Sequence, residues 1–331
     1  MPVLDGQDIA AVRAAARRLA AGELVAFPTE TVYGLGARAD DDAAVAAVFA
    51  AKGRPADHPL IVHVADPDAA SRFAAGLGAA ERSLIAAFWP GPVTVIVPRA
   101  AGMAAAAAGG QGSIGLRCPA HPVAQALLRE AARLGVAGIA APSANRFGRI
   151  SATTALHVVQ EFGPGLTVLD GGECALGIES AIIDCSSPGA APALLRPGTL
   201  TRERIEAVLG QALRERDAAS PRASGTLAAH YAPAARLLLL PAGALRAMLT
   251  GRQGAALPEG VAVYSRTRFA AGNGVLFQAM PADPAAAAHE LFSVLRGFDA
   301  AGARQIWVEQ PPPDPEWEGV SDRLKRAAAA G

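Results

Sequence analysis

Apolar positions recur along the chain at two spacings, and the change from one to the other predicts helices and strands in turn. Ile9, Val12, Ala16 and Leu19 recur at helical spacing, which predicts an amphipathic helix over residues 8–20. Short apolar runs bounded by Pro, Gly or Asp predict strands at 23–27, 60–64, 93–97, 113–117, 136–140, 166–170 and 181–184. Further helices are expected at 40–52, 81–88 and 121–133. Helices among strands of mixed spacing predict an α/β domain whose twisted sheet is partly antiparallel and flanked by helices.

The pattern breaks near residue 211 and restarts near residue 236. The intervening segment is rich in charged and small residues, which is typical of a linker. Beyond it, strands are expected at 237–240, 261–264 and 306–308, and helices at 284–297 and 316–330. We therefore predict a domain over 1–210, a linker over 211–235, and a smaller open-sheet α/β domain over 236–331. Apart from Asp299, the last domain shows no clustered polar residues.

Polar residues gather where the strand at 23–27 ends. Pro28 stops that strand, and Gly34 and Gly36 are interpreted as turn residues with positive φ, beyond a buried strand end. The following helix ends at Lys52-Gly53-Arg54-Pro55, where two cations flank a glycine. These features predict a site for an anionic, phosphate-bearing substrate. The alanine-rich and glycine-rich residues 100–112 are expected to form a mobile loop.

Composition narrows the function classes. The 331 residues include 30 basic and 30 acidic side chains, so the net charge gives no general reason for binding to nucleic acid or anionic membrane. The three cysteines lack metal-ligand spacing, and neither a signal pattern nor a membrane-spanning apolar run is found. We expect a cytoplasmic protein without a metal site of its own, without a membrane partner and without stable nucleic-acid binding.

Several candidate residues have an ordinary structural interpretation as well. Lys52 and Arg54 taken alone are typical of a solvated helix end, and His63 inside an apolar strand is typical of a core histidine. Arg117 is harder to explain, because a buried arginine needs an anionic partner, for which a substrate carboxylate is the natural candidate. No GxxxxGK[ST] phosphate loop occurs, and the looser glycine pattern at 34–39 precedes the helix start, so we interpret it as turn geometry.

Several ordered motifs together resemble one family, the YrdC-like L-threonylcarbamoyladenylate synthases. They are Thr29-Glu30-Thr31-Val32-Tyr33-Gly34-Leu35, Lys52-Gly53-Arg54-Pro55, Pro59-Leu60-Ile61-Val62-His63 and Ser143-Ala144-Asn145. The segment ending in His230-Tyr231-Ala232-Pro233 resembles the linker of the family's long two-domain form. The chain departs from the pattern at Ser224, at Phe147 and at Ala181-Ile182.

The resemblance implies a nucleotidyltransferase that joins L-threonine, bicarbonate and ATP into threonylcarbamoyl-AMP and releases pyrophosphate. The product would pass to the machinery that transfers threonylcarbamoyl to tRNA. The resemblance assigns L-threonine to Thr31, His63, Arg117, Ala141 (through its backbone) and Ser180. It assigns ATP to Lys52, Arg54, His58, Ser113, Ser143, Asn145, Ser151, Arg196 and Tyr231, with Lys52 and Arg54 as the catalytic cations. Mg²⁺ is expected to arrive with the triphosphate. We also expect residues 220–233 to act as a lid over the nucleotide.

Two alternatives remain at this stage. A double-stranded RNA or tRNA-binding module would use the same fold, although the chain shows no aromatic residues interleaved with basic ones. A carbamoyl-transfer subunit of the kind used in hydrogenase maturation would have a longer chain with zinc-finger cysteines. Pyrophosphate release that requires threonine and bicarbonate together would separate the synthase from both.

Overall fold

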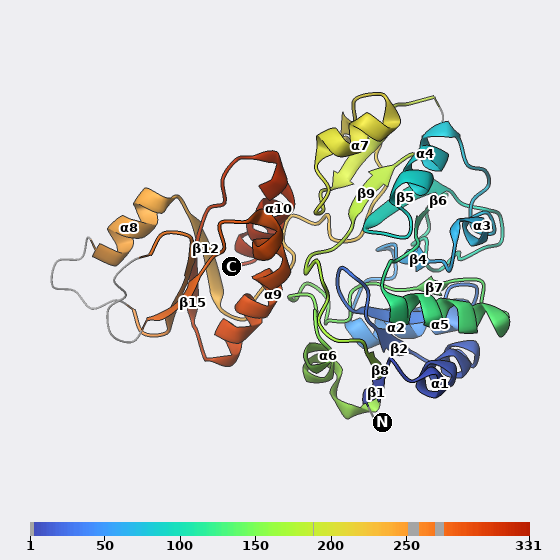
Figure 1. Ribbon diagram of the computed structural model, residues 1–331, viewed down its shortest axis with the longest axis horizontal. Coiled ribbons are helices and arrows are strands. Elements are labelled where there is room, and N and C mark those ends of the chain that lie inside the picture. Colours follow the sequence, from blue (N-terminus) through green and yellow to red (C-terminus); the bar gives the residue numbers. More distant parts are fainter. Residues whose placement is uncertain (1–2, 188, 251–257, 269–274) are drawn as a thin grey trace. The chain divides into compact units, whose positions relative to one another are not determined.

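The computed structural model describes residues 3–187, 189–250, 258–268 and 275–331, and its chain divides into two units (Figure 1). The first unit runs to Phe147 and then from Ser151 to Thr226. The second consists of Leu227–Gly331 together with the short segment Gly148–Ile150. The chain therefore passes between the units at 147/148, at 150/151 and at 226/227.

A mixed sheet organises the first unit and confirms the predicted α/β class. From one edge to the other, its strands are β1 (Val3–Asp5), β8 (Thr167–Asp170), β2 (Val25–Phe27), β3 (Gly34–Arg38), β7 (Ile139–Ala140), β4 (Ile61–His63), β6 (Ser113–Arg117), β5 (Val93–Pro98), β9 (Ala181–Asp184), β10 (Ala193–Arg196) and β11 (Arg214–Glu215). Strand β4 runs parallel to β6 and antiparallel to β7, while β5 runs parallel to β9 and antiparallel to β6. This mixture places the ends of β2, β4, β5, β6 and β9 around a common region.

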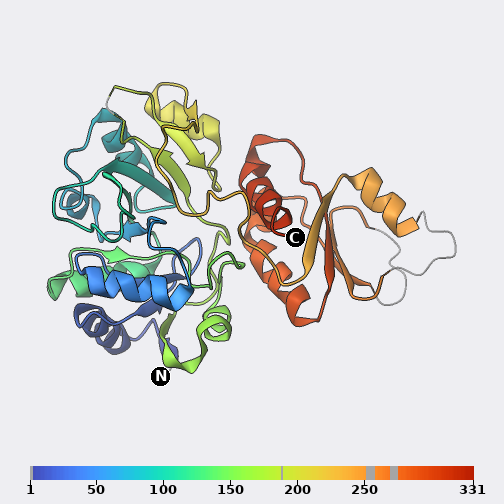
Figure 2. The ribbon, with the colours of Figure 1, turned by 180° about the vertical axis from the view of Figure 1, so that it is seen from behind.

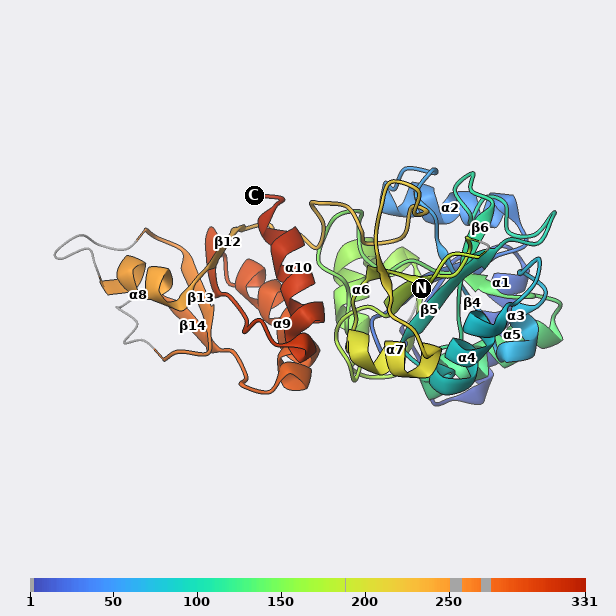
Figure 3. The ribbon, with the colours of Figure 1, turned by 90° about the horizontal axis from the view of Figure 1, so that it is seen from above.

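Helices cover both faces of this sheet. On one face, α1 (Ile9–Ala20) and α5 (Pro122–Arg133) lie side by side and bury Leu19 and Leu127 against β2 and β7. On the other, α2 (Asp42–Lys52) packs Val45 and Val48 against β3. The remaining helical segments of this unit are α3 (Pro67–Ala70), α4 (Ala79–Phe88), α6 (Ala155–Phe162), η1 (Gly163–Gly165) and α7 (Arg202–Leu209). Figure 3 shows α4 and α7 next to each other.

The two motif glycines are packing residues, and the prediction of positive-φ turns at Gly34 and Gly36 is wrong. Both lie within β3 and adopt strand conformation. A β-carbon on Gly36 would lie 2.7 Å from Ile139 Cγ2 and 2.8 Å from Phe27 Cε1. The motif thus needs glycine because neighbouring side chains occupy the space that a methyl group would take.

The alanine-rich segment at 100–112 also differs from expectation. Ala104, Ala107 and Ala108 are buried in the same apolar core as the central strands. The Ala107 carbonyl accepts a hydrogen bond from Leu60 N at 2.8 Å. Small side chains let part of this irregular segment pack against the core, while Ala101, Gly102, Ala105, Gly110 and Gly112 stay exposed.

The second unit has three layers. Its parallel sheet is ordered β12 (Arg236–Leu240), β15 (Gln305–Glu309), β13 (Val261–Ser265) and β14 (Leu276–Ala279). One face is covered by α8 (Ala242–Thr250), and the other by α9 (Pro284–Ala300) and α10 (Glu318–Ala328), which follows η2 (Pro315–Trp317) (Figure 2). This arrangement confirms the predicted smaller open-sheet α/β unit.

Candidate active site

The end of α2 places two cations side by side. Asp41 caps the helix start by accepting from Ala43 N and Ala44 N, and Gly53 ends it in the left-handed conformation with φ of 64°. Lys52 is 3 % exposed, and its Nζ donates to the Ser143 carbonyl at 2.6 Å and to the Asn145 carbonyl. Burial, reinforced by the positive charge of Arg54, holds the pKa of Lys52 well below its ordinary value.

Arg54 is held by backbone carbonyls and by the linker. Its Nη2 donates to the Pro59 carbonyl at 2.9 Å and to the Ser224 hydroxyl at 3.2 Å. Its guanidinium carbon lies 5.6 Å from the centroid of the Phe147 ring, which also meets His58 edge-on. Phe147, one of the departures from the family pattern, thus supplies a flat surface that orients both predicted ATP ligands. Burial and the neighbouring Arg54 lower the pKa of His58.

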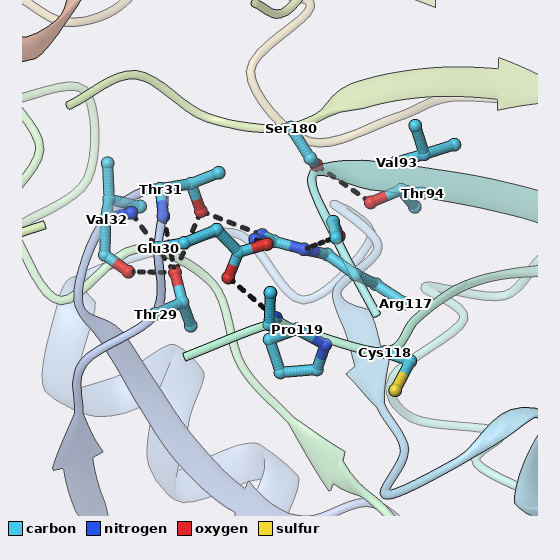
Figure 4. Close-up of polar contacts among 12 residues, drawn as sticks. Thr29, Glu30, Thr31, Val32, Val93, Thr94, Arg117, Cys118, Pro119 and Ser180 are labelled. Atoms are coloured by element: carbon cyan, nitrogen blue, oxygen red, sulfur yellow. Dashed lines mark hydrogen bonds and ion pairs between the residues drawn. The ribbon is translucent and has the colours of Figure 1, made fainter. Parts of the chain in front are cut away.

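A network of buried polar groups surrounds Arg117 (Figure 4). Arg117 Nη1 donates to the Thr31 hydroxyl at 2.8 Å, Nε donates to the Gly91 carbonyl at 3.2 Å, and Nη2 lies 2.6 Å from Glu30 Oε1. The anionic partner that a buried arginine requires is therefore Glu30 of the same chain, a residue that the sequence analysis missed. Its signal was present in the motif, since Glu30 stands between two threonines next to a strand end.

Ser180 bonds to Thr94 and to Arg196, one of the predicted ATP ligands. Its hydroxyl lies 2.8 Å from the hydroxyl of Thr94 on β5, as Figure 4 shows. Arg196, at the end of β10, donates from Nε to the Ser180 carbonyl at 3.0 Å and from Nη2 to the Ser180 hydroxyl at 3.2 Å. Arg196 Nη1 also donates to the Ser224 carbonyl at 2.9 Å. Two arginines from different elements thus meet one linker residue.

His63 lies inside the sheet, opposite Arg117 on β6 and Ile139 on β7. Its ring meets Phe27 edge-on at 5.9 Å between centroids. Burial and the nearby Arg117 charge lower the pKa of His63 to about 3, so the imidazole is neutral at physiological pH. The backbone N–H of Ala141 donates to the Ile61 carbonyl at 2.9 Å, which directs any Ala141 contribution to its carbonyl.

The loop after β7 brings together three more predicted ATP ligands. The Ser143 and Asn145 carbonyls both accept hydrogen bonds from Lys52 Nζ. Asn145 Nδ2 donates to the Arg146 carbonyl at 2.7 Å. Ser151 is fully buried, and its hydroxyl donates to the carboxylate of Glu179, a second acidic residue that the sequence analysis missed. These contacts orient the backbone of the loop around the Lys52 amine.

A small cavity lies between the linker and the sheet. Ile61, Ile96 and Ile182 line its apolar side, Ser113 and Thr94 its polar side, and Arg222, Ala223 and Ser224 of the linker also line it. Its volume of about 20 Å³ is room for roughly one water molecule. Ser224 Oγ donates to the Pro59 carbonyl at 2.8 Å, and Arg222 N donates to Gln111 Oε1 at 2.8 Å. Ser224 thus bonds to two predicted ATP ligands, Arg54 and Arg196, and lines this cavity together with a third, Ser113.

Tyr231 is the one predicted ATP ligand that belongs to the second unit. Its ring stacks on Phe292 at 5.6 Å and lies 5.3 Å from the Arg323 guanidinium carbon. Its backbone has φ of 61°, which is uncommon for a residue with a side chain. Its contact with ATP stays a prediction.

Within the described parts of the chain, no three His, Cys, Asp or Glu side chains are close enough together to hold a metal ion. Glu30 and Glu179 are single carboxylates that already have partners. This donor set fits an ion that is carried by a triphosphate better than one held by the protein. No helix of the described residues is long and apolar enough to cross a membrane.

Comparisons with known proteins identify the family and the fold. Residues 17–198 match the Sua5/YciO/YrdC family described as "Telomere recombination", and residues 200–329 match the threonylcarbamoyl-AMP synthase C-terminal domain. The chain is 41 % identical over 235 residues to threonylcarbamoyl-AMP synthase of Pyrococcus abyssi, which covers 69 % of this chain and 67 % of that protein. It is 31 % identical over 353 residues to the Schizosaccharomyces pombe threonylcarbamoyl-AMP synthase, covering 92 % and 85 % of the two chains. The crystal structure of P. abyssi Sua5 complexed with L-threonine superposes with a TM-score of 0.86 at 34 % identity, over 98 % of this chain and 95 % of that one.

Proposed function

This chain belongs to the threonylcarbamoyl-AMP synthase family, and from that membership we propose how its site performs the reaction. The chain is a nucleotidyltransferase that makes threonylcarbamoyl-AMP, and we propose L-threonine, bicarbonate and ATP as its substrates. One observation supports this proposal best: Arg54 and Arg196 both donate hydrogen bonds to Ser224. Arg196 also donates to Ser180, whose hydroxyl contacts Thr94. The cations that we assign to phosphate are thus joined through Ser180 to a group that we assign to threonine.

The proposed chemistry needs no nucleophilic side chain. The threonine amine adds to CO₂ derived from bicarbonate and loses a proton, which gives a carbamate. A carbamate oxygen then attacks the α-phosphorus of ATP, the bond to the β-phosphate oxygen breaks, and pyrophosphate leaves. Catalysis therefore rests on holding the reactants in line and on stabilising phosphate charge.

Arg54 and Arg196 suit the triphosphate, because guanidinium groups grip phosphate oxygens through two N–H donors. Lys52 acts differently. Its amine is buried and bound to the Ser143 and Asn145 carbonyls, so it fixes the loop that carries the other ATP ligands as well as lying near the phosphates. Mg²⁺ bound to the triphosphate would neutralise further negative charge.

Threonine suits the group around Arg117. The guanidinium, held by Glu30 and the Gly91 carbonyl, is oriented toward Thr31, where a substrate carboxylate would bind. The neutral His63 imidazole can accept a hydrogen from the threonine amine, which an imidazolium could not do. A desolvated surrounding also favours the uncharged amine, the form that reacts with CO₂.

The seated linker requires a change in our expectation of the lid. Ala223 and Ser224 line a small cavity together with Ser113, so a nucleotide that reaches Ser113 there would meet these two residues. We propose that ATP displaces this segment, and that the segment returns over the bound substrates to exclude water from the carbamate and the mixed anhydride. The product then passes to the tRNA threonylcarbamoyl-transfer machinery, and we expect the reaction in the cytoplasm.

Pyrophosphate release measures the proposed function directly. We expect release from ATP only when threonine and bicarbonate are both present, together with a product of the mass of threonylcarbamoyl-AMP. Serine and glycine in place of threonine are the matched controls for the amino-acid site. Release that persists without threonine, or without bicarbonate, would contradict the proposal.

A further inference from the structure

A three-residue piece of the nucleotide loop belongs to the second unit. Gly148–Ile150 lies between Phe147 and Ser151, both of which belong to the first unit. Gly148 has φ of 78°, and its carbonyl accepts from Ala232 N at 2.8 Å. Arg149 and Ala232 form a parallel bridge, so this piece pairs with the chain just after Tyr231.

The paired segments, Gly148–Ile150 and the chain around Ala232, form what we call the ribbon, and helix α9 contacts both of them. Asp299 accepts from Ala234 N at 2.7 Å through Oδ2 and from Ala235 N at 3.0 Å through Oδ1, and its Oδ2 lies 3.7 Å from Arg149 Nη2. One turn earlier on the helix, Arg296 donates from Nη2 to the Ile150 carbonyl. Ile150 itself is 2 % exposed, so its carbonyl lies at a buried position. Two side chains of α9 thereby fix the backbone on both sides of the ribbon.

The residues that flank the ribbon contact the proposed nucleotide site. Phe147 N donates to the Lys52 carbonyl at 2.9 Å, and its ring lies under Arg54. Ser151 bonds to Glu179 at the other side. Three residues span at most about 10 Å even when fully extended, so a displacement of Gly148–Ile150 has to move Phe147 or Ser151.

We propose that Arg296 and Asp299 are positioning residues for ATP, through which the second unit sets the conformation of the loop from Asn145 to Ser151. This inference rests on the proposed assignment of Asn145 and Ser151 to ATP. It gives the second unit a part in the reaction, although neither residue touches substrate.

The test compares variants of the full chain for ATP and for threonine. In Arg296→Met the aliphatic stem remains while the donor to Ile150 is lost, and in Asp299→Ala the acceptor for both backbone N–H groups is lost. We expect the Kd of a non-hydrolysable ATP analogue to rise about tenfold in each, the factor associated with one lost buried hydrogen bond. The KM for threonine should change less than about twofold. Asp299→Asn keeps one of the two acceptors, so its Kd should lie between those of Asp299→Ala and the unaltered chain.

Glu290→Ala is the matched control on the same helix. Glu290 accepts from the Tyr264 hydroxyl at 3.0 Å, so the variant also removes a hydrogen bond from α9, at a position away from the ribbon. We expect its ATP Kd to match that of the unaltered chain. The inference is overturned if Arg296→Met and Asp299→Ala bind the ATP analogue normally, or if ATP and threonine weaken equally in step with a lower Tm. Failure of the proposed function itself would differ, because the unaltered chain would then release no threonine-dependent pyrophosphate.

Discussion

Glu30 and Arg117 form an ion pair in which Glu30 Oε1 lies 2.6 Å from Arg117 Nη2, so the guanidinium proposed to bind threonine already has an anionic partner. The other carboxylate oxygen accepts from Ala120 N at 3.1 Å, which fixes Glu30 in place. Arg117 is 4 % exposed, so its positive charge is largely removed from water. The negative charge of Glu30 offsets the free-energy cost of that burial, in a site that we propose also binds a carboxylate.

Glu30→Gln should lower the stability of the chain, because it leaves the buried guanidinium without a negative partner. We expect the free energy of unfolding to fall by about 3 kcal/mol. Threonine should then raise the Tm of this variant more than that of the unaltered chain, since its carboxylate replaces the missing charge. Thermal unfolding with and without threonine measures both effects. An equal shift in the two proteins would mean that the threonine carboxylate binds elsewhere.

Arg117→Lys should raise the KM for threonine by about tenfold and leave the KM for ATP nearly unchanged. A lysine keeps the charge opposite Glu30 but cannot reach Thr31 and the Gly91 carbonyl at the same time. Steady-state kinetics with each substrate varied in turn provides the measurement. If both KM values rose together, Arg117 would act on the site as a whole and not on the amino acid.

Arg54→Ala should reduce adenylate formation by at least about 100-fold, because a cation that stabilises phosphate charge is lost. The fold should persist, since the groups that this side chain bonds to, the Pro59 carbonyl and Ser224, lie outside the helices and strands. Pyrophosphate release, together with far-UV circular dichroism, checks both parts. Arg72→Ala, at an exposed position, is the matched loss of an arginine and should retain full turnover. Comparable turnover in the two variants would remove Arg54 from the phosphate site.

His63 should make the stability of the chain depend on pH. Its pKa falls from 6.5 to about 3 on folding, so between these values the unfolded chain binds a proton that the folded chain does not. Stability from this residue is therefore present above pH 6.5 and is lost as the pH falls toward 3. Between pH 7 and pH 5 the unaltered chain should lose about 2 kcal/mol more than His63→Asn. Urea unfolding at the two pH values measures the difference, and identical losses would show that folding does not lower the pKa of His63.

A non-hydrolysable ATP analogue should increase the rate of trypsin cleavage after Arg222. In the proposed mechanism the nucleotide displaces Ala223 and Ser224 from the cavity that they line, and this releases the neighbouring Arg222 from Gln111. Adding threonine and bicarbonate should slow the cleavage again if the linker closes over the substrates. Arg222→Gln identifies the fragment that arises at this position. A cleavage rate unaffected by any ligand would mean that the segment is a passive tether.

The strands and helices were largely predictable because their apolar spacing is regular. The run from Val93 to Val97 and the helix that starts at Pro284 lie where their patterns indicate. The conformation of Gly36 was not predictable in the same way, because its cause is the space occupied by Ile139, a residue about 100 positions away in the sequence. A glycine in a motif indicates a need for small size or for unusual φ, and the sequence alone does not distinguish the two.

The candidate site shows the same division. Lys52, Arg54 and Arg117 could be selected because each is a charge in an unusual place. Glu30 and Glu179 were missed because a carboxylate near a turn is ordinary in a sequence, and only the fold shows that one pairs with Arg117 and the other with Ser151. The position of Ala223 and Ser224 over the sheet could not be predicted either. The composition of a linker predicts a flexible segment, not one that is held against the sheet by hydrogen bonds.

The passage of Gly148–Ile150 into the second unit has a consequence for any attempt to shorten this chain. A polypeptide that stops at Thr226 would retain Ser143, Asn145 and Ser151 yet lose Ala232, Arg296 and Asp299. Gly148–Ile150 would then lose the backbone hydrogen bond from Ala232 and the side-chain contacts from α9. Such a fragment would be an enzyme with a loose nucleotide loop, so the boundary between the units is a poor place to cut even though it is the obvious one.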